Sequence, residues 1–365
     1  MVRNNRIVYY VTSHGFGHLN RAAAVVEAMP RHVSVLVKTH RDLFPRWRES
    51  VRRRSDLIEG VFDCGAVHPP GESSLVDPAA TLAKNQQVHA AALERLDREV
   101  AFLRSNSIAA VVSDIAPLPL RAANEAGIPS ILVANFTWAD IFANYVGSRS
   151  SGDRELLREM CHEYGHASHY FRAQPAIESH VADRACDVGL VTRRGRNRRT
   201  ELLRELGLRR GSRLVYMYVG RYGQDDMEWT NLTRLADFQF VSYHPLEIRF
   251  PHWHVLDPDR WPPRDLAASV DAMVAKAGYG TVTDAMANRT PLIFPPRFGF
   301  AEHRVLAAGL RRWGGGISIS TRDFKQLHLR RALELACKLS PKPSPWPSDG
   351  ARRCARAILR LCRDR

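Results

Sequence analysis

This chain of 365 residues has few lysines, no closely paired cysteines and no long apolar run. Its six cysteines include no Cys-x-x-Cys pair, which argues against a disulfide framework and against a structural zinc site. No apolar stretch reaches the roughly 18 residues that a membrane-spanning helix needs, and the N-terminal residues enter a strand-like run instead of a secretory signal. We therefore expect a cytoplasmic protein that binds no metal.

Arginine supplies most of the positive charge. Only six of the 53 lysine and arginine residues are lysines, the formal net charge is +15, and the arginines are densest between residues 192 and 213. Such a run suits nucleic acid, an anionic membrane surface or a phosphorylated substrate, and it also suits a solvated protein face. Because no aromatic residues alternate with these arginines, we do not expect a nucleic-acid partner. A peripheral contact with an anionic membrane surface stays open.

Strand-like and helix-like segments alternate twice along the chain. Apolar runs such as IVYYV at 7–11 and AAVVSD at 109–114 precede helical patterns, and the alternation resumes with RLVYMYVG at 213–220. Continuous valine and isoleucine runs followed by helices are typical of buried parallel strands with crossover helices. The sequence therefore predicts an α/β protein with two facing Rossmann-like, doubly wound domains and a cleft between them. We place the two domains and a last helix at residues 1–192, 193–345 and 346–365.

The first predicted strand leads into the loop HGFGHLNRA, residues 14–22. Two glycines after a strand suggest a dinucleotide fingerprint, but Asn20 stands where the third glycine would be, and a P-loop would need a lysine followed by serine or threonine. A phosphate cradle is therefore not favoured. His14 and His18 remain at the mouth of the cleft, where a histidine can act as a general base because its ordinary pKa is about 6.5. A histidine that caps the following helix is the structural alternative.

Asp114 ends the predicted strand at 109–114. The carboxyl ends of neighbouring parallel strands converge, so this carboxylate can orient a histidine of the first loop and stabilise its protonated form. It could equally cap the next helix. The sequence therefore offers a candidate histidine–aspartate pair.

A second glycine turn, KAGYGT, lies at residues 276–281. Gly278 and Gly280, with Thr281 at a helix start, would present backbone N–H groups and the positive end of a helix to a diphosphate. Lys276 adds a charge. Such turns are common before helices, so the motif alone carries little weight.

Carboxylate and imidazole side chains follow this turn. Asp284 lies one helical turn beyond Thr281, where it could accept hydrogen bonds from both hydroxyls of a ribose, or only favour the helix dipole. Glu302 and His303 follow the next predicted strand and would face the same cleft. Their side chains suit sugar hydroxyls, and an ordinary polar surface is the alternative.

These motifs together resemble those of the two-lobed nucleotide-sugar glycosyltransferases called GT-B. A closer resemblance is to the glycosyltransferase-like N-terminal half of plant arabinokinases, through YYVTSHGFGHLNRAAAVVEAM, VFDCGAVHPPG, VVSDIAPLPLRAANEAGIPSILVANFTWADIFANYV, LVTRR and AKAGYGTVTDAM. This resemblance covers nearly the whole chain but not the sugar-kinase half of that family, so it does not imply kinase activity. It implies that the last helix packs back on the first domain.

Transferred position by position, the resemblance implies roles for individual residues. His18 would deprotonate an acceptor hydroxyl, with Asp114 as its partner. The residues implied to hold the nucleotide sugar are Gly17, Lys276, Gly278, Tyr279, Gly280, Thr281, Asp284, Glu302 and His303. Our candidate contacts to the acceptor or to an anion are His14, Asn135, Trp138, Arg193 and Arg194. Lys276 stands where many relatives have a histidine, and Asp284 replaces the more usual glutamate, which shortens the reach to the ribose.

We therefore expect an inverting, metal-independent glycosyltransferase. It would move a sugar from a nucleotide sugar, with a UDP-sugar as the first candidate, to a hydroxyl of a small-molecule, glycan or lipid-linked acceptor, and it would need no other cofactor. Two alternatives stay open: a non-catalytic regulatory module that binds a sugar or nucleotide sugar, and a nucleotide-sugar epimerase on the same scaffold. The sequence specifies neither the donor sugar, nor the acceptor, nor the oligomeric state.

Overall fold

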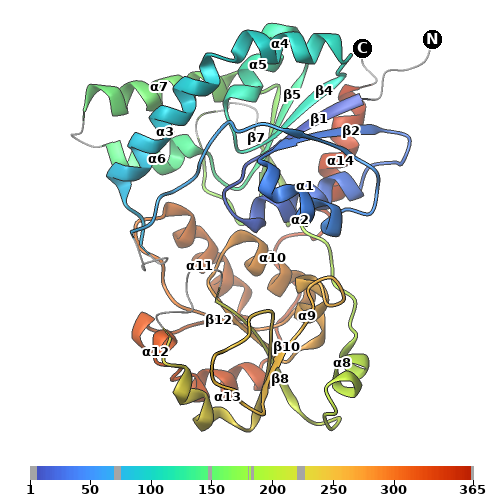
Figure 1. The fold of residues 1–365 in the computed structure, drawn as a ribbon, viewed down its shortest axis with the longest axis vertical. Helices are drawn as coiled ribbons and strands as arrows, with labels where there is room; N and C mark the ends of the chain where they lie inside the picture. Colours follow the sequence, from blue (N-terminus) through green and yellow to red (C-terminus); the bar gives the residue numbers. More distant parts are fainter. Residues whose placement is uncertain are drawn as a thin grey trace.

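The computed structural model describes residues 6–69, 75–146, 150–179, 181, 185–219 and 227–362. They form two lobes, with the blue to green part of the chain above and the yellow to orange part below (Figure 1). Each lobe contains its own parallel sheet. The predicted fold class, two facing doubly wound α/β domains, is confirmed.

The first lobe is built on one sheet of seven strands. They are β1 (Arg6–Val11), β2 (Ser34–Thr39), β3 (Asp56–Glu59), β4 (Ala110–Asp114), β5 (Ser130–Ala134), β6 (His169–Ala173) and β7 (Ala185–Gly189). Their order is β3-β2-β1-β4-β5-β6-β7, and every pairing is parallel. The order reverses between β1 and β4, and doubly wound folds bind their ligands at such a point.

Helices cover both faces of this sheet (Figure 1). They are α1 (Phe16–Glu27), α2 (Phe44–Ser50), α3 (Pro78–Leu93), α4 (Leu96–Ser105), α5 (Leu118–Ala126), α6 (Trp138–Val146) and α7 (Ser151–Gly165), with a 3-10 turn, η1 (Arg41–Leu43). Successive side chains of a strand point to opposite faces, so Tyr9 packs in the core that contains α1 while Tyr10 packs in the core that contains α4. Strands buried on both faces explain the continuous apolar runs in the sequence.

The second lobe repeats this architecture with six strands. They are β8 (Arg213–Tyr218), β9 (Phe238–Ser242), β10 (Trp253–Val255), β11 (Ala272–Ala275), β12 (Leu292–Phe294) and β13 (Gly316–Ser318). The order is β10-β9-β8-β11-β12-β13, again all parallel. Here the order reverses between β8 and β11.

Shorter helices surround the second sheet. They are α8 (Arg199–Glu205), α9 (Pro263–Ser269), α10 (Tyr279–Asn288), α11 (Ala301–Trp313), α12 (Thr321–Lys325) and α13 (Arg330–Lys338), with a 3-10 segment, η2 (Trp229–Leu235). Within the part of the chain that the structure describes, no helix is both long enough and apolar enough to span a membrane.

The last helix, α14 (Gly350–Leu361), returns to the first lobe and packs against α1 and β7. Figure 1 shows it in red beside α1. Its start is closely packed, since a Cβ at Gly350 would lie 2.6 Å from the carbonyl oxygen of Leu190. The buried side chains of Cys354 and Ile358 join the core of the first lobe. The second lobe is therefore tied to the first at both of its ends.

Candidate functional site

Two side chains of the first lobe meet where the strand order reverses. His18 lies in the first turn of α1, just after β1, and Asp114 is the last residue of β4. Val11 pairs with Asp114 in the parallel ladder, so the two strand ends lie side by side. The two loops selected from the sequence therefore share one edge of the sheet.

His18 and Asp114 form a hydrogen-bonded pair. His18 Nδ1 lies 2.7 Å from Asp114 Oδ1. Asp114 is completely buried, and His18 is 8% exposed. A carboxylate only accepts hydrogen bonds, so Nδ1 carries a hydrogen, and in the neutral ring Nε2 then has the lone pair. This is the tautomer that a general base requires.

Arg21 is the third member of this group, and the sequence analysis missed it. One helical turn after His18, it donates to both oxygens of Asp114, from Nε to Oδ2 at 2.9 Å and from Nη2 to Oδ1 at 2.7 Å. Nη2 also lies 2.9 Å from His18 Nδ1, but two donors in this arrangement do not bond to each other. A signal was present, because Arg21 is the one charged residue between Leu19 and Val26.

Charge rather than solvation sets the protonation of this group. Burial raises the pKa of the Asp114 carboxyl, but Arg21 and His18 more than offset burial, so that pKa lies below its ordinary value. Burial also opposes the charge of Arg21, whereas Asp114 raises the Arg21 pKa above its ordinary value. Asp114 is therefore an anion shared between His18 and a permanent cation.

The polar network continues into the second lobe. Arg21 Nη1 donates to Asn135 Oδ1 at 2.5 Å, and Asn135 Nδ2 donates to Glu302 Oε1 at 2.8 Å. Asn135 is completely buried and Glu302 is 5% exposed. Asn135 follows β5, and Glu302 lies in the first turn of α11. The bond between them joins the lobes.

The backbone beside Asp114 is strained. Ile115 has φ = 72°, a left-handed conformation that β-branched residues rarely adopt. Its side chain is completely buried, and its carbonyl accepts a hydrogen bond from the Tyr164 hydroxyl at 2.6 Å. Such strain, on the order of 1–3 kcal/mol, persists where surrounding structure enforces it. Here the left-handed residue turns the chain directly after the Asp114 carboxylate.

His14 lies in an aromatic cluster beside the pair of His18 and Asp114. Its ring meets Trp138 edge-on, with centroids 5.5 Å apart, and its centroid is 6.2 Å from that of His18. Burial, followed by the charges of His18 and Arg297, lowers the pKa of His14 to about 3. His14 is therefore neutral at pH 7. Of the acceptor contacts predicted with His14, the side chains of Trp138 and Asn135 are completely buried and bonded to other residues, so they can act only by positioning their neighbours.

Asp63, in the stretch VFDCG, is a second buried carboxylate that the sequence analysis did not select. It accepts hydrogen bonds from Thr12 Oγ1 at 2.6 Å and from Trp138 Nε1 at 2.7 Å. Burial raises the pKa of Asp63, and these two hydrogen bonds oppose the rise. Asp63 thus holds Trp138 against the loop that follows β1.

The glycine turn of the second lobe faces the first loop of the first lobe. A Cβ at Gly17 would lie 3.6 Å from the backbone nitrogen of Gly280. Gly278 is the N-cap of α10, and Thr281 lies in its first turn, partly buried. The first backbone N–H groups of a helix have no partner within the helix. Two helix N-termini, those of α1 and α10, therefore meet between the lobes.

Tyr279 differs from the other residues of this turn because its side chain packs on the first lobe. The Arg21 guanidinium carbon lies 5.0 Å from its ring centroid. Its hydroxyl accepts from the Val191 N–H at 3.1 Å and lies within donating distance of the Gln174 carbonyl, at 3.3 Å. The side chain is only 5% exposed. Only the backbone of Tyr279 remains a candidate contact for a nucleotide sugar.

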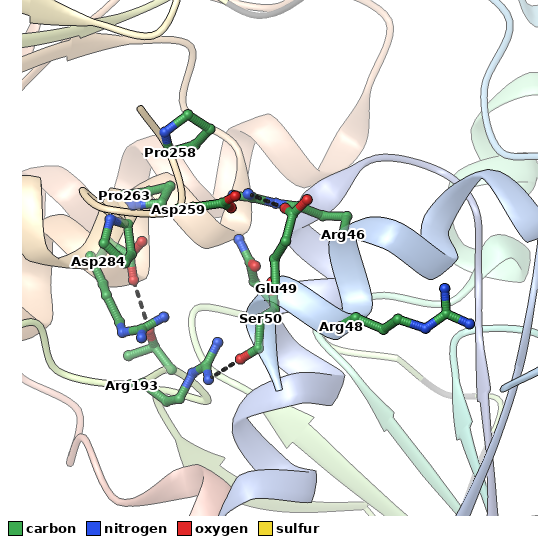
Figure 2. Close-up of a pocket in the computed structure, with 13 residues that line it drawn as sticks. Arg46, Arg48, Glu49, Ser50, Arg193, Pro258, Asp259, Pro263 and Asp284 are labelled. Atoms are coloured by element: carbon green, nitrogen blue, oxygen red, sulfur yellow. Dashed lines mark hydrogen bonds and ion pairs between the residues drawn. The ribbon is translucent and has the colours of Figure 1, made fainter. Parts of the chain in front are cut away.

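Asp284 lines a cavity of about 410 Å³ between the lobes. Figure 2 shows Asp284 and Pro263 of the second lobe on one side of it, with Glu49 and Ser50 of α2 on the other. Asp284 Oδ1 accepts a hydrogen bond from Thr192 Oγ1 at 2.8 Å. Burial raises the pKa of Asp284 to about 6. The volume is typical of small-molecule sites, which span about 300–1,000 Å³.

Three basic side chains, Lys276, Arg297 and His303, follow the ends of β11 and β12 in the second lobe. Lys276 follows β11 and His303 lies in the first turn of α11, and both are partly buried. Burial and the charge of Arg297 lower the pKa of His303 to about 4. His303 Nδ1 and Arg297 Nε are buried with no hydrogen-bond partner among the described residues. Buried polar atoms normally have partners, so these two atoms suit a polar ligand. The described ranges contain no cluster of three or more potential metal ligands.

Arg193 and Arg194 line a second cavity, of about 490 Å³, beside the Asp284 cavity. Arg193 Nη1 donates to the Ser50 carbonyl at 2.6 Å, which connects the interlobe linker, residues 190–198, to the first lobe. The arginine run is not a uniform charged face, because Arg199 instead pairs with Asp271 at 2.9 Å within the second lobe.

No family model matches the chain, but its sequence is similar to that of a curated protein. The chain is 32% identical over 345 residues to L-arabinokinase from Arabidopsis thaliana, an alignment that covers 91% of this chain and 32% of the relative. The chain therefore spans about a third of the length of the curated relative that it matches. The resemblance to arabinokinases is confirmed for that part alone.

Solved structures of glycosyltransferases have the same fold. The glycotransferase of kitacinnamycin superposes with a TM-score of 0.64 at 15% identity, over 99% of this chain and 97% of that one. A UDP-glucosyltransferase from Polygonum tinctorium capable of glucosylating indoxyl superposes with a TM-score of 0.62 at 13% identity, over all of both chains. The chain has the GT-B fold of glycosyltransferases, and in sequence it is similar to one third of L-arabinokinase.

Proposed function

We propose that this protein is an inverting, metal-independent glycosyltransferase that moves a sugar from a UDP-sugar to an acceptor hydroxyl. The observation that carries this proposal is the meeting of two elements across the lobes. The hydrogen-bonded pair of His18 and Asp114 lies at the N-terminus of α1, and Gly17 in the same turn contacts Gly280 at the N-terminus of α10. The first element supplies a base, and the second supplies a place for a diphosphate.

In the proposed reaction, His18 Nε2 takes the proton of the acceptor hydroxyl. The acceptor oxygen forms a bond to the anomeric carbon of the sugar, while the bond from that carbon to the phosphate oxygen breaks and its electron pair leaves with UDP. Attack and departure on opposite faces invert the configuration at this carbon. Asp114 holds the imidazole in the right tautomer and stabilises the imidazolium that forms.

The departing diphosphate gains negative charge. The backbone N–H groups of residues 278–281, at the positive end of α10, are suited to receive it, and the ammonium group of Lys276 adds a full charge. Fixed donors of this kind stabilise a transition state without reorganising. In this proposal they act in place of a divalent cation.

The Asp284 cavity is the proposed nucleoside site. Asp284 is on α10, the helix whose N-terminus would hold the diphosphate, so one helix would contact two parts of the donor. Its carboxylate would accept the ribose hydroxyls. Glu302 and His303 would contact the sugar. Asn135 bonds to Oε1 of Glu302, so Oε2 would accept from a sugar hydroxyl. The name of the UDP-glucosyltransferase from Polygonum tinctorium makes a UDP-sugar the first donor to test.

The test is a donor panel with a variant at the base. Thermal-shift measurements with UDP-, GDP- and dTDP-sugars select the donor, since a ligand of the native state raises its stability. Nucleotide release is then followed with a panel of hydroxyl acceptors. His18→Ala should lower transfer by about 10²–10⁴-fold and leave the Kd for UDP essentially unchanged. An undiminished rate in His18→Ala would remove the assigned base.

A non-catalytic module that binds a nucleotide sugar is the second candidate. It is favoured by one observation: Arg21 Nη2 lies 2.9 Å from His18 Nδ1, where a permanent cation repels the positive charge that a base acquires with its proton. Such a module would bind the donor tightly and release no nucleotide with any acceptor in the panel. Transfer with even one acceptor excludes it.

A further inference from the structure

The cavity beside the Asp284 site is lined mainly by arginine. It is about 490 Å³ in volume, and its wall comes from the first lobe, the linker and the second lobe together. The arginines are Arg52, Arg193, Arg194, Arg196, Arg198, Arg260 and Arg264. The carboxylates in the same wall are Glu27, Asp259 and Asp265. We call this cavity the arginine pocket.

Some of these arginines are neutralised by carboxylates. Arg198 Nη2 lies 2.6 Å from Glu201, and Arg260 Nη2 lies 2.9 Å from Glu205. Arg264 Nε lies 3.9 Å from Asp265 Oδ1. These three guanidinium groups therefore bring little net charge to the pocket.

The other four, Arg52, Arg193, Arg194 and Arg196, form no side-chain ion pair with any residue that the structure describes. Arg193 Nη1 bonds to a neutral partner, the Ser50 carbonyl. Burial and the charge of Arg264 lower the pKa of Arg193 to about 10, as expected among other cations. Only Glu27 and Asp259 remain to balance these four groups, which leaves an excess of two positive charges.

Glu27 is itself engaged elsewhere. Its Oε1 accepts hydrogen bonds from the backbone N–H groups of Arg52, at 2.6 Å, and of Arg53, at 3.1 Å. These bonds fix the start of the segment after α2. They hold Arg52 at the pocket and leave the carboxylate with less capacity to bind guanidinium groups.

The linker that carries three of the unpaired arginines is held in place. A Cβ at Gly195 would lie 1.8 Å from the Arg264 carbonyl oxygen, so glycine alone permits this approach. The Gly195 N–H donates to Asn288 Oδ1, and the Arg196 N–H donates to Asp265 Oδ1, both at 3.0 Å. The arginines therefore project from a fixed backbone, and the pocket is built rather than formed by chance contacts of long side chains.

We propose that the arginine pocket is a second ligand site, which binds a phosphate monoester dianion. A phosphate monoester carries a charge of about −1.5 to −2 at pH 7, which matches the excess of positive charge. The planar fork of a guanidinium group fits phosphate oxygens. The ligand would connect Arg52 of the first lobe with Arg193 and Arg194 of the linker, and would thereby hold the interlobe linker against the first lobe.

Calorimetric titration of the full chain with glycerol 3-phosphate at about 0.15 M ionic strength, where long-range attraction is screened, tests this site. We expect saturable binding at one site, and at least a tenfold rise in Kd for the double variant Arg194→Glu/Arg196→Glu. The matched control is Arg209→Glu/Arg210→Glu, which makes the same charge change in the same run with exposed residues outside the pocket. The control should bind like the wild type.

Three results would overturn the proposal: no saturable binding by the wild type, equal losses in the two double variants, or displacement of glycerol 3-phosphate by saturating UDP. The last result would assign the phosphate to the nucleotide site. All three are read from binding and need no transferase activity, so they are independent of the proposed function.

A second arm identifies the source of the phosphate. Vesicles with phosphatidic acid present a monoester, and vesicles with phosphatidylglycerol present a diester. If the natural ligand is a lipid head group, the wild type should bind the phosphatidic acid vesicles in preference, and Arg194→Glu/Arg196→Glu should lose that preference. Binding of glycerol 3-phosphate without binding of either vesicle would identify a free phosphorylated small molecule.

Discussion

Arg21 and Asp114 form a bidentate ion pair in the interior of the first lobe, with Nε to Oδ2 at 2.9 Å and Nη2 to Oδ1 at 2.7 Å. Arg21 is 1% exposed and Asp114 is not exposed at all. The same Asp114 oxygen that accepts from Nη2 also lies 2.7 Å from the imidazole of His18. This pair therefore supports both the fold of the first lobe and the orientation of the candidate base.

Replacing Arg21 by methionine should strongly destabilise the protein. The change keeps most of the side-chain volume but leaves Asp114 as a buried charge without its cation, and breaking a buried pair in this way costs about 3–5 kcal/mol. Urea unfolding measures the free energy. Arg121→Met is the control, since it removes an exposed pair with Glu125 and should change stability by less than about 1 kcal/mol. Equal losses would show that the pair at Arg21 has no special structural role.

Asp284→Asn should weaken UDP binding while stabilising the free protein. Burial raises the pKa of Asp284 to about 6, above its ordinary value. The folded protein therefore binds this proton more tightly than the unfolded chain, so ionising Asp284 lowers stability at pH 7, and stability rises as the pH falls through about 6. Thermal melts of wild type and variant at pH 5 and pH 8 measure this difference.

The same group gives UDP binding its own pH dependence. If the ionised carboxylate accepts the ribose hydroxyls, the affinity of the wild type for UDP should fall as the pH is lowered through about 6, and Asp284→Asn should remove this dependence. Calorimetric titrations at several pH values provide the measurement. A variant that binds UDP as tightly as the wild type at pH 8 would refute the ribose assignment.

Glu302→Gln should lower the kcat/KM of transfer and leave the contact between the lobes intact. Glutamine keeps an amide oxygen that can accept from Asn135 Nδ2 but removes a carboxylate from the proposed sugar contacts. Hydrogen bonds to a charged group contribute about 1.5–3 kcal/mol, so kcat/KM should fall about tenfold or more. The exposed Glu247→Gln variant is the control and should keep the wild-type kcat/KM. An unchanged kcat/KM in Glu302→Gln would remove Glu302 from the proposed sugar contacts.

Gly65→Ala should cost more stability than Gly127→Ala. Both glycines have left-handed backbones, with φ of 73° and 70°, so alanine is strained by about 1–2 kcal/mol at either site. At Gly127 a Cβ meets no atom within 4 Å, whereas at Gly65 it would lie 2.0 Å from the ring of His14. The displaced ring should add about 1–3 kcal/mol to the loss. Urea unfolding of the two variants measures the difference, and equal losses would mean that His14 moves freely.

Local pattern was enough to predict much of the fold and part of the site. The buried strands are continuous apolar runs in the sequence. Ligands of doubly wound sheets bind at strand ends, so the polar residues in the turns after β1, β4 and β11 were the ones to select. The proximity of His18 and Asp114 was predicted in the same way, since the ends of adjacent parallel strands converge. Their catalytic roles stay predictions.

Residues that act through long-range packing were beyond the reach of such patterns. Arg21 was not selected from the sequence, and only the fold buries it against Asp114. Tyr279 was assigned to the nucleotide sugar through its motif, but its side chain packs on Arg21 in the other lobe. Similarly, the arginine run divides into paired and unpaired residues that sequence spacing does not distinguish.

The sequence by itself determined the two-lobed α/β class and the loops that carry the candidate site, because hydrophobic periodicity and turn composition act over a few neighbouring residues. The tertiary structure alone decided which charges are buried together. Asn135 and Glu302 are 167 positions apart and share one hydrogen bond, and Arg52 reaches the same pocket as Arg264. Electrostatic interactions depend on distance and burial in three dimensions, and neither quantity can be read from the order of residues along the chain.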